Sequence, residues 1–231
     1  MTTTLGTSPT TTTRDGGPPL LVPGLAFAAL TLGGAILGSG TPRPADAAAQ
    51  VLSYDQNHGT VLAVSATLLF ASAIPLVIWA VTAYRRLGVR VPGPLMGVAG
   101  GVLAAASIAL SGLFAWTAGQ TAQLADPALA RTLTSLSFST GAAGFVVPFG
   151  LLITGIAVPS LILKRLPRAL AWAGVVMGAL GMLATLTLLI PALDPLLPIG
   201  RFGGVIWLVV ASVLLPAGRR PRPAATSTGP S

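Results

Sequence analysis

Cysteine and glutamate are absent from this chain, and histidine and lysine each occur once. The lack of cysteine excludes disulfides, thiolate metal sites and cysteine nucleophiles. A single histidine excludes haem held by two histidines. Charged residues make up only 8% of the 231 residues. A soluble domain carries about 25% charged residues, so this composition does not provide a water-facing surface.

Apolar residues are abundant where charged residues are few. They make up 53% of the chain, and the mean hydropathy is +0.83. The net charge of +8 reflects the absence of glutamate, and most basic residues stand in short clusters between apolar runs. We therefore expect a lipid bilayer as the partner and no nucleic acid. The composition predicts an integral membrane protein and leaves its oligomeric state open.

Six apolar runs approach or exceed the roughly 20 helical residues that cross a bilayer core. None contains an acidic residue, and none shows the alternation of barrel strands. The fold class is therefore all-α, a polytopic bundle of six transmembrane helices within residues 20–217. The predicted spans are 20–39, 60–83, 94–118, 140–163, 169–192 and 199–217.

The basic residues predict the orientation. Ten of the thirteen lie in the two tails and in the loops 84–93 and 164–168. Because cytoplasmic loops are enriched in lysine and arginine, these segments are placed in the cytoplasm, so both termini are inside. The residues that set this topology, besides Arg14, are Arg85, Arg86, Arg90, Lys164, Arg165, Arg168, Arg219, Arg220 and Arg222.

The two tails and the first span carry further expectations. Residues 1–19 are rich in Thr, Gly and Pro, and residues 218–231 in Pro, Arg, Ser and Thr, so both are predicted to be disordered. Residues 1–47 also resemble a secretory signal, because "ADAAAQ" after the first run offers a small-residue cleavage site. The run is long for a signal, and Pro42 and Pro44 lie close to that site, so we expect a first span.

The stretch "SYDQNHG" at 53–59 gathers the most side-chain chemistry. Ser53 and Gln56 fit a capping box, which predicts a helix that begins at Tyr54. Asp55 and His58 are three residues apart and are weak candidates for a metal site, a proton relay or a pH sensor. Metal sites need three or four ligands, and the other aspartates stand singly. We expect no metal, no cofactor and no catalytic residue.

Three further features concern the outer side and the helix interiors. Asp126 before Pro127 predicts a short helix over 126–136 that lies on the outer membrane surface. Arg201 is placed at the edge of the last span, where its head group reaches the interface. Trp79, Trp116 and Trp172 are expected near the span ends, and Trp207 is expected to pack more deeply.

Glycine pairs spaced four apart predict close helix packing within the chain. They are Gly34 and Gly38, Gly97 and Gly101, Gly174 and Gly178, and Gly200 and Gly204. Pro75, Pro148 and Pro159 interrupt predicted helices, and the carbonyls they free are candidates to line a cavity.

From about residue 54 to 216 the chain resembles a family of uncharacterised six-span bacterial membrane proteins of actinobacterial type, grouped as a domain of unknown function. The resemblance is carried by "AIPLVIWAVTAYRRLGVRVPGP" (73–94), "GFVVPFGLLITGIAVPS" (144–160) and "LLPIGRFGGVIWLV" (196–209). It implies a six-span topology in a bacterial plasma membrane and supplies no activity, cofactor or site residue.

No catalytic group lies within a predicted span. We therefore expect a non-enzymatic sensory, regulatory or envelope-associated bundle. The alternative is a transporter of a small solute or lipid, which the prolines and a weak repeat of basic loop and Gly-rich helix favour. A membrane enzyme that uses the outer Asp and His groups is third.

Overall fold

The computed structural model describes residues 19–43, 45–87 and 93–215. The predictions for Arg90 and for the two tails, apart from Pro19, lie outside these residues. Within them the chain forms helices and no strand, and six stretches are long and apolar enough to cross a membrane. The all-α bundle predicted from the sequence is thus confirmed. The six spans are Leu21–Gly40, Gly59–Leu87, Gly93–Leu124, Pro127–Ile162, Arg168–Leu188 and Pro191–Leu214.

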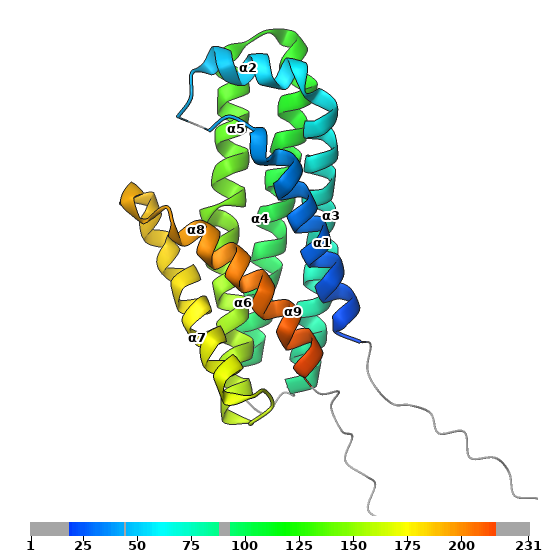
Figure 1. Ribbon diagram of the computed structural model, residues 1–231, viewed down its shortest axis with the longest axis vertical. Coiled ribbons are helices and arrows are strands. Elements are labelled where there is room, and N and C mark those ends of the chain that lie inside the picture. Colours follow the sequence, from blue (N-terminus) through cyan, green and yellow to red (C-terminus); the bar gives the residue numbers. More distant parts are fainter. Residues whose placement is uncertain (1–18, 44, 88–92, 216–231) are drawn as a thin grey trace, which may run out of the picture.

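The spans are built from the helices labelled in Figure 1. The α-helices are α1 Leu21–Leu37, α2 Ala48–Asn57, α3 Gly59–Leu87, α4 Gly93–Thr121, α5 Pro127–Gly141, α6 Ala143–Ile162, α7 Arg168–Leu183, α8 Leu196–Pro198 and α9 Gly204–Leu214. Short 3₁₀ segments follow α1 (η1, Gly38–Gly40), α4 (η2, Ala122–Leu124) and α7 (η3, Ala184–Leu188; η4, Pro191–Leu193). Between α8 and α9 lies a π-helical turn, η5, at Ile199–Gly203.

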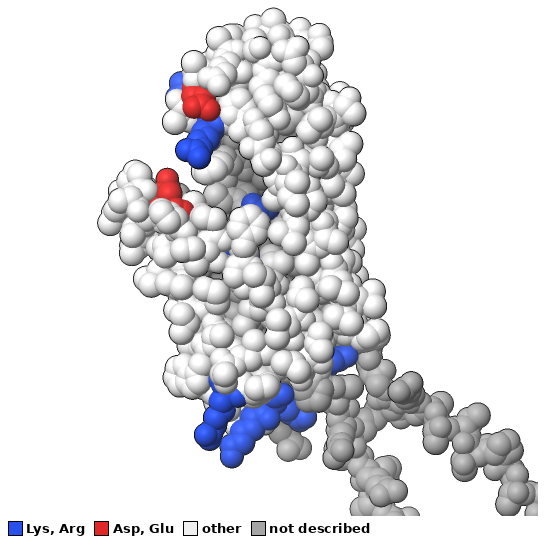
Figure 2. All heavy atoms as spheres, viewed as in Figure 1, with Lys and Arg blue, Asp and Glu red and all other residues white. Residues whose placement is uncertain are grey.

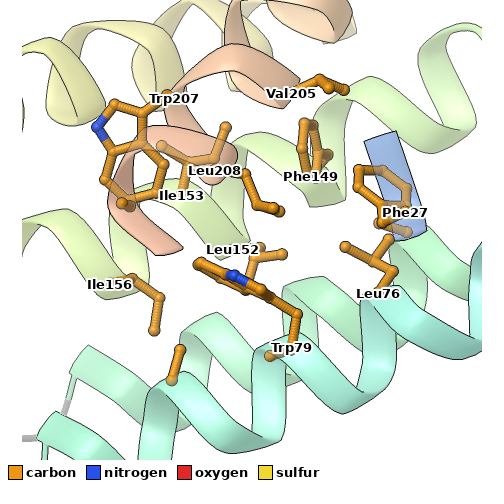
Figure 3. Close-up of a cluster of buried hydrophobic side chains, with 14 of the residues drawn as sticks. Phe27, Leu76, Trp79, Phe149, Leu152, Ile153, Ile156, Val205, Trp207 and Leu208 are labelled. Carbon is orange, nitrogen blue, oxygen red and sulfur yellow. The ribbon is translucent and has the colours of Figure 1, made fainter. Parts of the chain in front are cut away.

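Neighbouring helices pack as a bundle around α6. The helix α6 contacts α4 on one side and α7 on another, while α3 packs between α1 and α4. Their shared core is apolar, and Figure 3 shows Trp79 and Leu152 facing Ile153 and Leu208 within it. Trp79 is fully buried and donates from Nε1 to Ser212 Oγ at 2.7 Å. Trp79 is therefore a core residue and not the interfacial residue that its position near a span end predicted, whereas Trp207 is buried as expected.

All eight of the paired glycines lie against a neighbouring helix of the same chain. A Cβ on Gly34 or Gly38 would meet α3, and one on Gly97 would lie 3.2 Å from the Gly155 carbonyl carbon of α6. Gly101 faces Ala80, Gly174 faces Trp207, and Gly178 faces Thr154. Gly200 and Gly204 bring η5 and α9 against Val146 and Phe149. The last pair places the π-helical turn close to α6.

Basic side chains gather at one end of the bundle, as Figure 2 shows. This is the end where α3 finishes with Arg85 and Arg86, and where α6 connects to α7 through Lys164 and Arg165. Arg168 begins α7 at the same end. The aspartates of the described loops, Asp46, Asp126 and Asp194, belong to the opposite end. The cytoplasmic position of both termini was predicted from this separation of basic and acidic residues.

At the less basic end, two helices differ from the predictions. The helix α2 is separate from α3 and lies across the end of the bundle (Figure 1). The helix α5 is not a short surface helix, because it packs along α4 and continues into α6 in one 36-residue span. Asp126 does cap α5, since its Oδ1 accepts from the backbone N–H of Ala128 at 2.9 Å. The cap was predicted correctly, but the orientation and the length of the helix were not.

Candidate functional site: a charged cavity inside the bundle

Arg201 lies near the middle of the sixth span, Pro191–Leu214, and not at its edge as predicted. It is the central residue of the π-helical turn η5. Turns of this kind are rare and are frequent at functional sites. The expected reach to the membrane interface is therefore wrong, because the side chain lines a cavity within the bundle.

The guanidinium of Arg201 has few partners. No described residue accepts a hydrogen bond from it, and its Nε atom is buried without a partner. The Phe145 ring lies 5.5 Å from Cζ, in cation–π geometry. Such a contact contributes about 2 kcal/mol or more when desolvated, and arginine at a helix centre costs roughly 2.5–3.5 kcal/mol to insert. The ring compensates this cation only in part, because the guanidinium N–H donors still lack a hydrogen-bond acceptor among the described residues.

The inner cavity, as we call the space above this guanidinium, has a volume of about 360 Å³. It lies between the end of α1, the first part of α3, the last third of α4, and α5. Asp55 of α2 lines it from the end of the bundle. Its size falls within the range of about 300–1,000 Å³ that small-molecule sites occupy. Most of the lining is apolar, and polar side chains are contributed by Ser65, Ser111, Thr134, Ser137 and the charged groups Arg43, Asp55 and Arg201.

The serine hydroxyls of the cavity are already used as donors. Ser65 Oγ donates to Gly34 O at 2.8 Å, and Ser111 and Ser137 each donate to the other's carbonyl oxygen at 2.8 and 2.9 Å. The charged donors among the described lining residues are Arg43 and Arg201. Donors without an internal acceptor are the groups with which a protein binds an anion.

Asp55 is the acidic group of the inner cavity. The residue is 1% exposed, and neither carboxylate oxygen has a hydrogen-bond partner among the described residues. It stands in the last turn of α2, where the helix dipole disfavours an anion. Burial raises the pKa of this carboxyl from its ordinary value to about 6. Asp55 was expected in a first turn, where the dipole would have favoured it, and that expectation was wrong.

A second space, the side cleft, adjoins the inner cavity and shares Arg43, Phe138 and Arg201 with it. Its volume is about 670 Å³, and it lies between the α5–α6 junction and the segment from Asp194 to Phe202. Figure 2 shows a hollow on the flank of the molecule with a basic side chain inside it. Because Arg201 lines both spaces, the side cleft makes it reachable from the flank of the molecule.

Towards the basic end, the inner cavity is closed by aromatic rings. Phe145 and Phe149 stack with centroids 4.9 Å apart, and Phe27 of α1 packs on Phe149 at 5.8 Å. All three rings are fully buried. Beyond them lies the apolar core of Leu152, Ile153 and Ile156, so nothing polar continues from the cavity towards the basic end through these residues.

The stretch "SYDQNHG" is the end of α2 and not the capped start of a long helix. Gln56 donates from Nε2 to Ala122 O at 3.1 Å, so it does not take part in the predicted capping box. His58 is exposed, stacks on Tyr54 at 4.2 Å, and stands at the break before α3. Because Asp55 is buried while His58 faces outwards, the two do not form the pair that we considered.

The described residues contain no group of three or more His, Cys, Asp and Glu side chains that could hold a metal. Pro75, Pro148 and Pro159 lie inside α3 and α6 but do not line the inner cavity or the side cleft. The carbonyls that they free are therefore not the polar groups of the site. Sequence reasoning missed Arg201 as a site residue, and the signal was a lone arginine between glycines in "PIGRFGG".

The structure thus defines a six-span membrane bundle with a charged cavity in its less basic half. No family model, no curated protein and no solved structure matches the chain.

Proposed function

We propose that this protein is a non-enzymatic membrane protein that binds an anionic ligand in the inner cavity from the non-cytoplasmic side. The observation that carries this proposal is the guanidinium of Arg201, placed in the middle of a span without a hydrogen-bond acceptor. An anion bound there compensates the cation where the Phe145 ring does so only in part. Intramembrane ionisable groups are costly and mark ligand or ion sites.

The closed aromatic end favours a receptor that senses a ligand from one side of a plasma membrane. Transport of the same ligand is the second candidate, since the cavity already reaches the middle of the sixth span. Transport further requires that the layer of Phe27, Phe145 and Phe149 opens.

The test is mass spectrometry of the small molecules that remain bound to the full chain in neutral detergent. We expect wild type to retain an anionic molecule and Arg201→Gln to retain at least about tenfold less, the loss of about 1.4 kcal/mol of binding. The matched control is Arg85→Gln, which removes an exposed arginine at the basic end. Arg201→Lys keeps the positive charge and should retain part of the ligand even if Arg201→Gln is unstable. Equal retention by wild type, Arg201→Gln and Arg201→Lys contradicts the proposal.

A further inference from the structure

We propose that the ligand is an amphiphile from the lipid phase, with an anionic head group at Arg201 and an alkyl chain in the side cleft. This inference rests on the proposed function and adds the chemical class of the ligand and its route. The structural basis is that one guanidinium lines two adjoining, mostly apolar spaces, of which the side cleft is the larger.

The inner cavity suits a head group. It holds the carboxyl of Asp55, the oxygens of Ser111 and Ser137, and the guanidinium of Arg201. The serine hydroxyls donate to carbonyl oxygens, so each keeps its own oxygen as an acceptor for a hydroxylated or protonated head group. Arg201 supplies the donors that match a phosphate or carboxylate.

The side cleft suits an alkyl chain. Its lining is mostly apolar and includes Phe138, Val146, Leu197 and Phe202. The charged residues that line it are Arg43, Asp194 and Arg201. With two arginines and one aspartate, the charged groups carry a net positive charge that complements an anionic amphiphile.

The position of the side cleft favours the lipid phase as the source. The cleft is bounded by α6, α8 and η5, which belong to the fourth and sixth spans. Large apolar side chains are exposed beside it, with Phe138 at 52% and Ile199 at 48%. Such a surface faces lipid rather than water in a membrane protein. A chain that lies in the cleft can therefore remain continuous with the bilayer while its head group reaches Arg201.

The helices explain why the flank is open at this level. The helix α1 packs against α9, where Gly24 lies beside Ser212. Figure 1 shows α1 and the α8–α9 segment separating towards the less basic end. Exposed apolar side chains such as Phe138 and Ile199 lie beside the opening that results, together with the charged Arg43 and Asp194.

The experiment compares radiolabelled octyl phosphate with ethyl phosphate, which has the same head group, on the full chain in nanodiscs of neutral lipid. Burying each methylene contributes about fourfold in affinity, the equivalent of about 0.8 kcal/mol. We expect octyl phosphate to bind at least tenfold more tightly than ethyl phosphate. Because partition into the bilayer also rises with chain length, binding to Arg201→Gln is subtracted as background.

Ser139→Trp tests the side cleft by itself. Ser139 is exposed, lines the side cleft and does not line the inner cavity. The indole should fill the cleft, lower the affinity for octyl phosphate at least tenfold and leave ethyl phosphate unchanged. Ser139→Ala is the matched control and should behave as wild type. Ala45→Trp fills the same cleft from an exposed loop position and replaces Ser139→Trp if that variant does not fold.

The outcomes separate the two proposals. If both phosphates bind equally, Arg201→Gln weakens the binding of each and Ser139→Trp weakens neither, the amphiphile proposal is contradicted. The proposal that Arg201 binds an anion then still holds. Binding of both phosphates that does not change in Arg201→Gln contradicts the anion site as well. A chain-length effect that disappears in Ser139→Trp supports the lipid-phase ligand.

Discussion

Two charged side chains define the site at the scale of single residues. Asp55 is buried without a hydrogen-bond partner among the described residues, and Arg201 has only the Phe145 ring. A buried polar group without a partner costs roughly 1–3 kcal/mol. Proteins retain such costs mainly where function requires the group. The two residues are therefore expected to lower stability while they serve binding.

Asp55→Asn should raise the melting temperature, and more so at alkaline pH. Because burial raises the pKa of the Asp55 carboxyl to about 6, the folded state favours the protonated form. The stability that this group contributes is present below about pH 4 and is lost as the pH rises through about 6. Asparagine stays neutral, so the variant avoids that loss.

Thermal melts in neutral detergent at about pH 4.5 and about pH 8 measure the difference. We expect a gain of about 2–4 °C at the higher pH, which corresponds to about 1 kcal/mol for a chain of this size, and a smaller gain at the lower pH. Asp194→Asn, at an exposed position, is the control for the loss of a surface carboxyl. A gain for Asp55→Asn that is larger at the acidic pH would show that the carboxyl is charged in the fold throughout.

At the scale of elements, close contact between α4 and α6 holds the bundle together. A Cβ on Gly100 would lie 2.6 Å from Leu152 N and 2.7 Å from Pro148 O. Backbone atoms in a helix cannot move aside as a flexible side chain does. The two helices therefore approach at a distance that only glycine permits at this position.

Gly100→Ala should destabilise the protein by about 1–3 kcal/mol through overpacking. Gly33→Ala is the matched control, because its Cβ would meet only Leu68 Cδ1 at 3.6 Å, an ordinary contact. That variant should be neutral or stabilised by a few tenths of a kcal/mol, since alanine favours a helix. Equal melting temperatures for the two variants would show that α4 and α6 do not approach as described.

The spans could be predicted from the sequence because hydropathy acts locally. The predicted run 60–83 lies within α3, and Asp126 caps α5 because a short side chain bonds its own backbone. Whether "SYDQNHG" begins or ends a helix could not be predicted, since polar residues occur at both ends of helices. The alanines at 47–49 extended α2 upstream of it.

Arg201 was misplaced for a related reason. Pro195 and Pro198 were placed in the connection between the fifth and sixth spans, and Pro191 at the end of the fifth, but proline is tolerated in the first turn of a helix. The last span therefore begins eight residues earlier than predicted, at 191 rather than 199, and Arg201 falls near its middle. That the side chain enters a cavity depends on contacts with α5 and α6, which are distant in sequence.

At the scale of the whole molecule, the cavity lies in the less basic half of the bundle and reaches Arg201 near the middle of the sixth span. Basic residues mark the opposite end (Figure 2), so the cavity is predicted to open outwards. Arg43 lines both spaces and Arg201 lies at their deeper meeting point. The central claim is that an anion reaches Arg201 from outside the cell.

The most direct measurement uses the absence of native cysteine. Ala115→Cys places a thiol on α4 in the inner cavity. We expect membrane-impermeant methanethiosulfonates added outside intact cells to modify it, and the anionic reagent to react faster than the cationic one. Adding Arg201→Gln should reduce that preference at least about threefold, since the cation in the cavity attracts the anion. Modification from the cytoplasmic side alone, or a preference that does not change when Arg201 is replaced, would contradict the account.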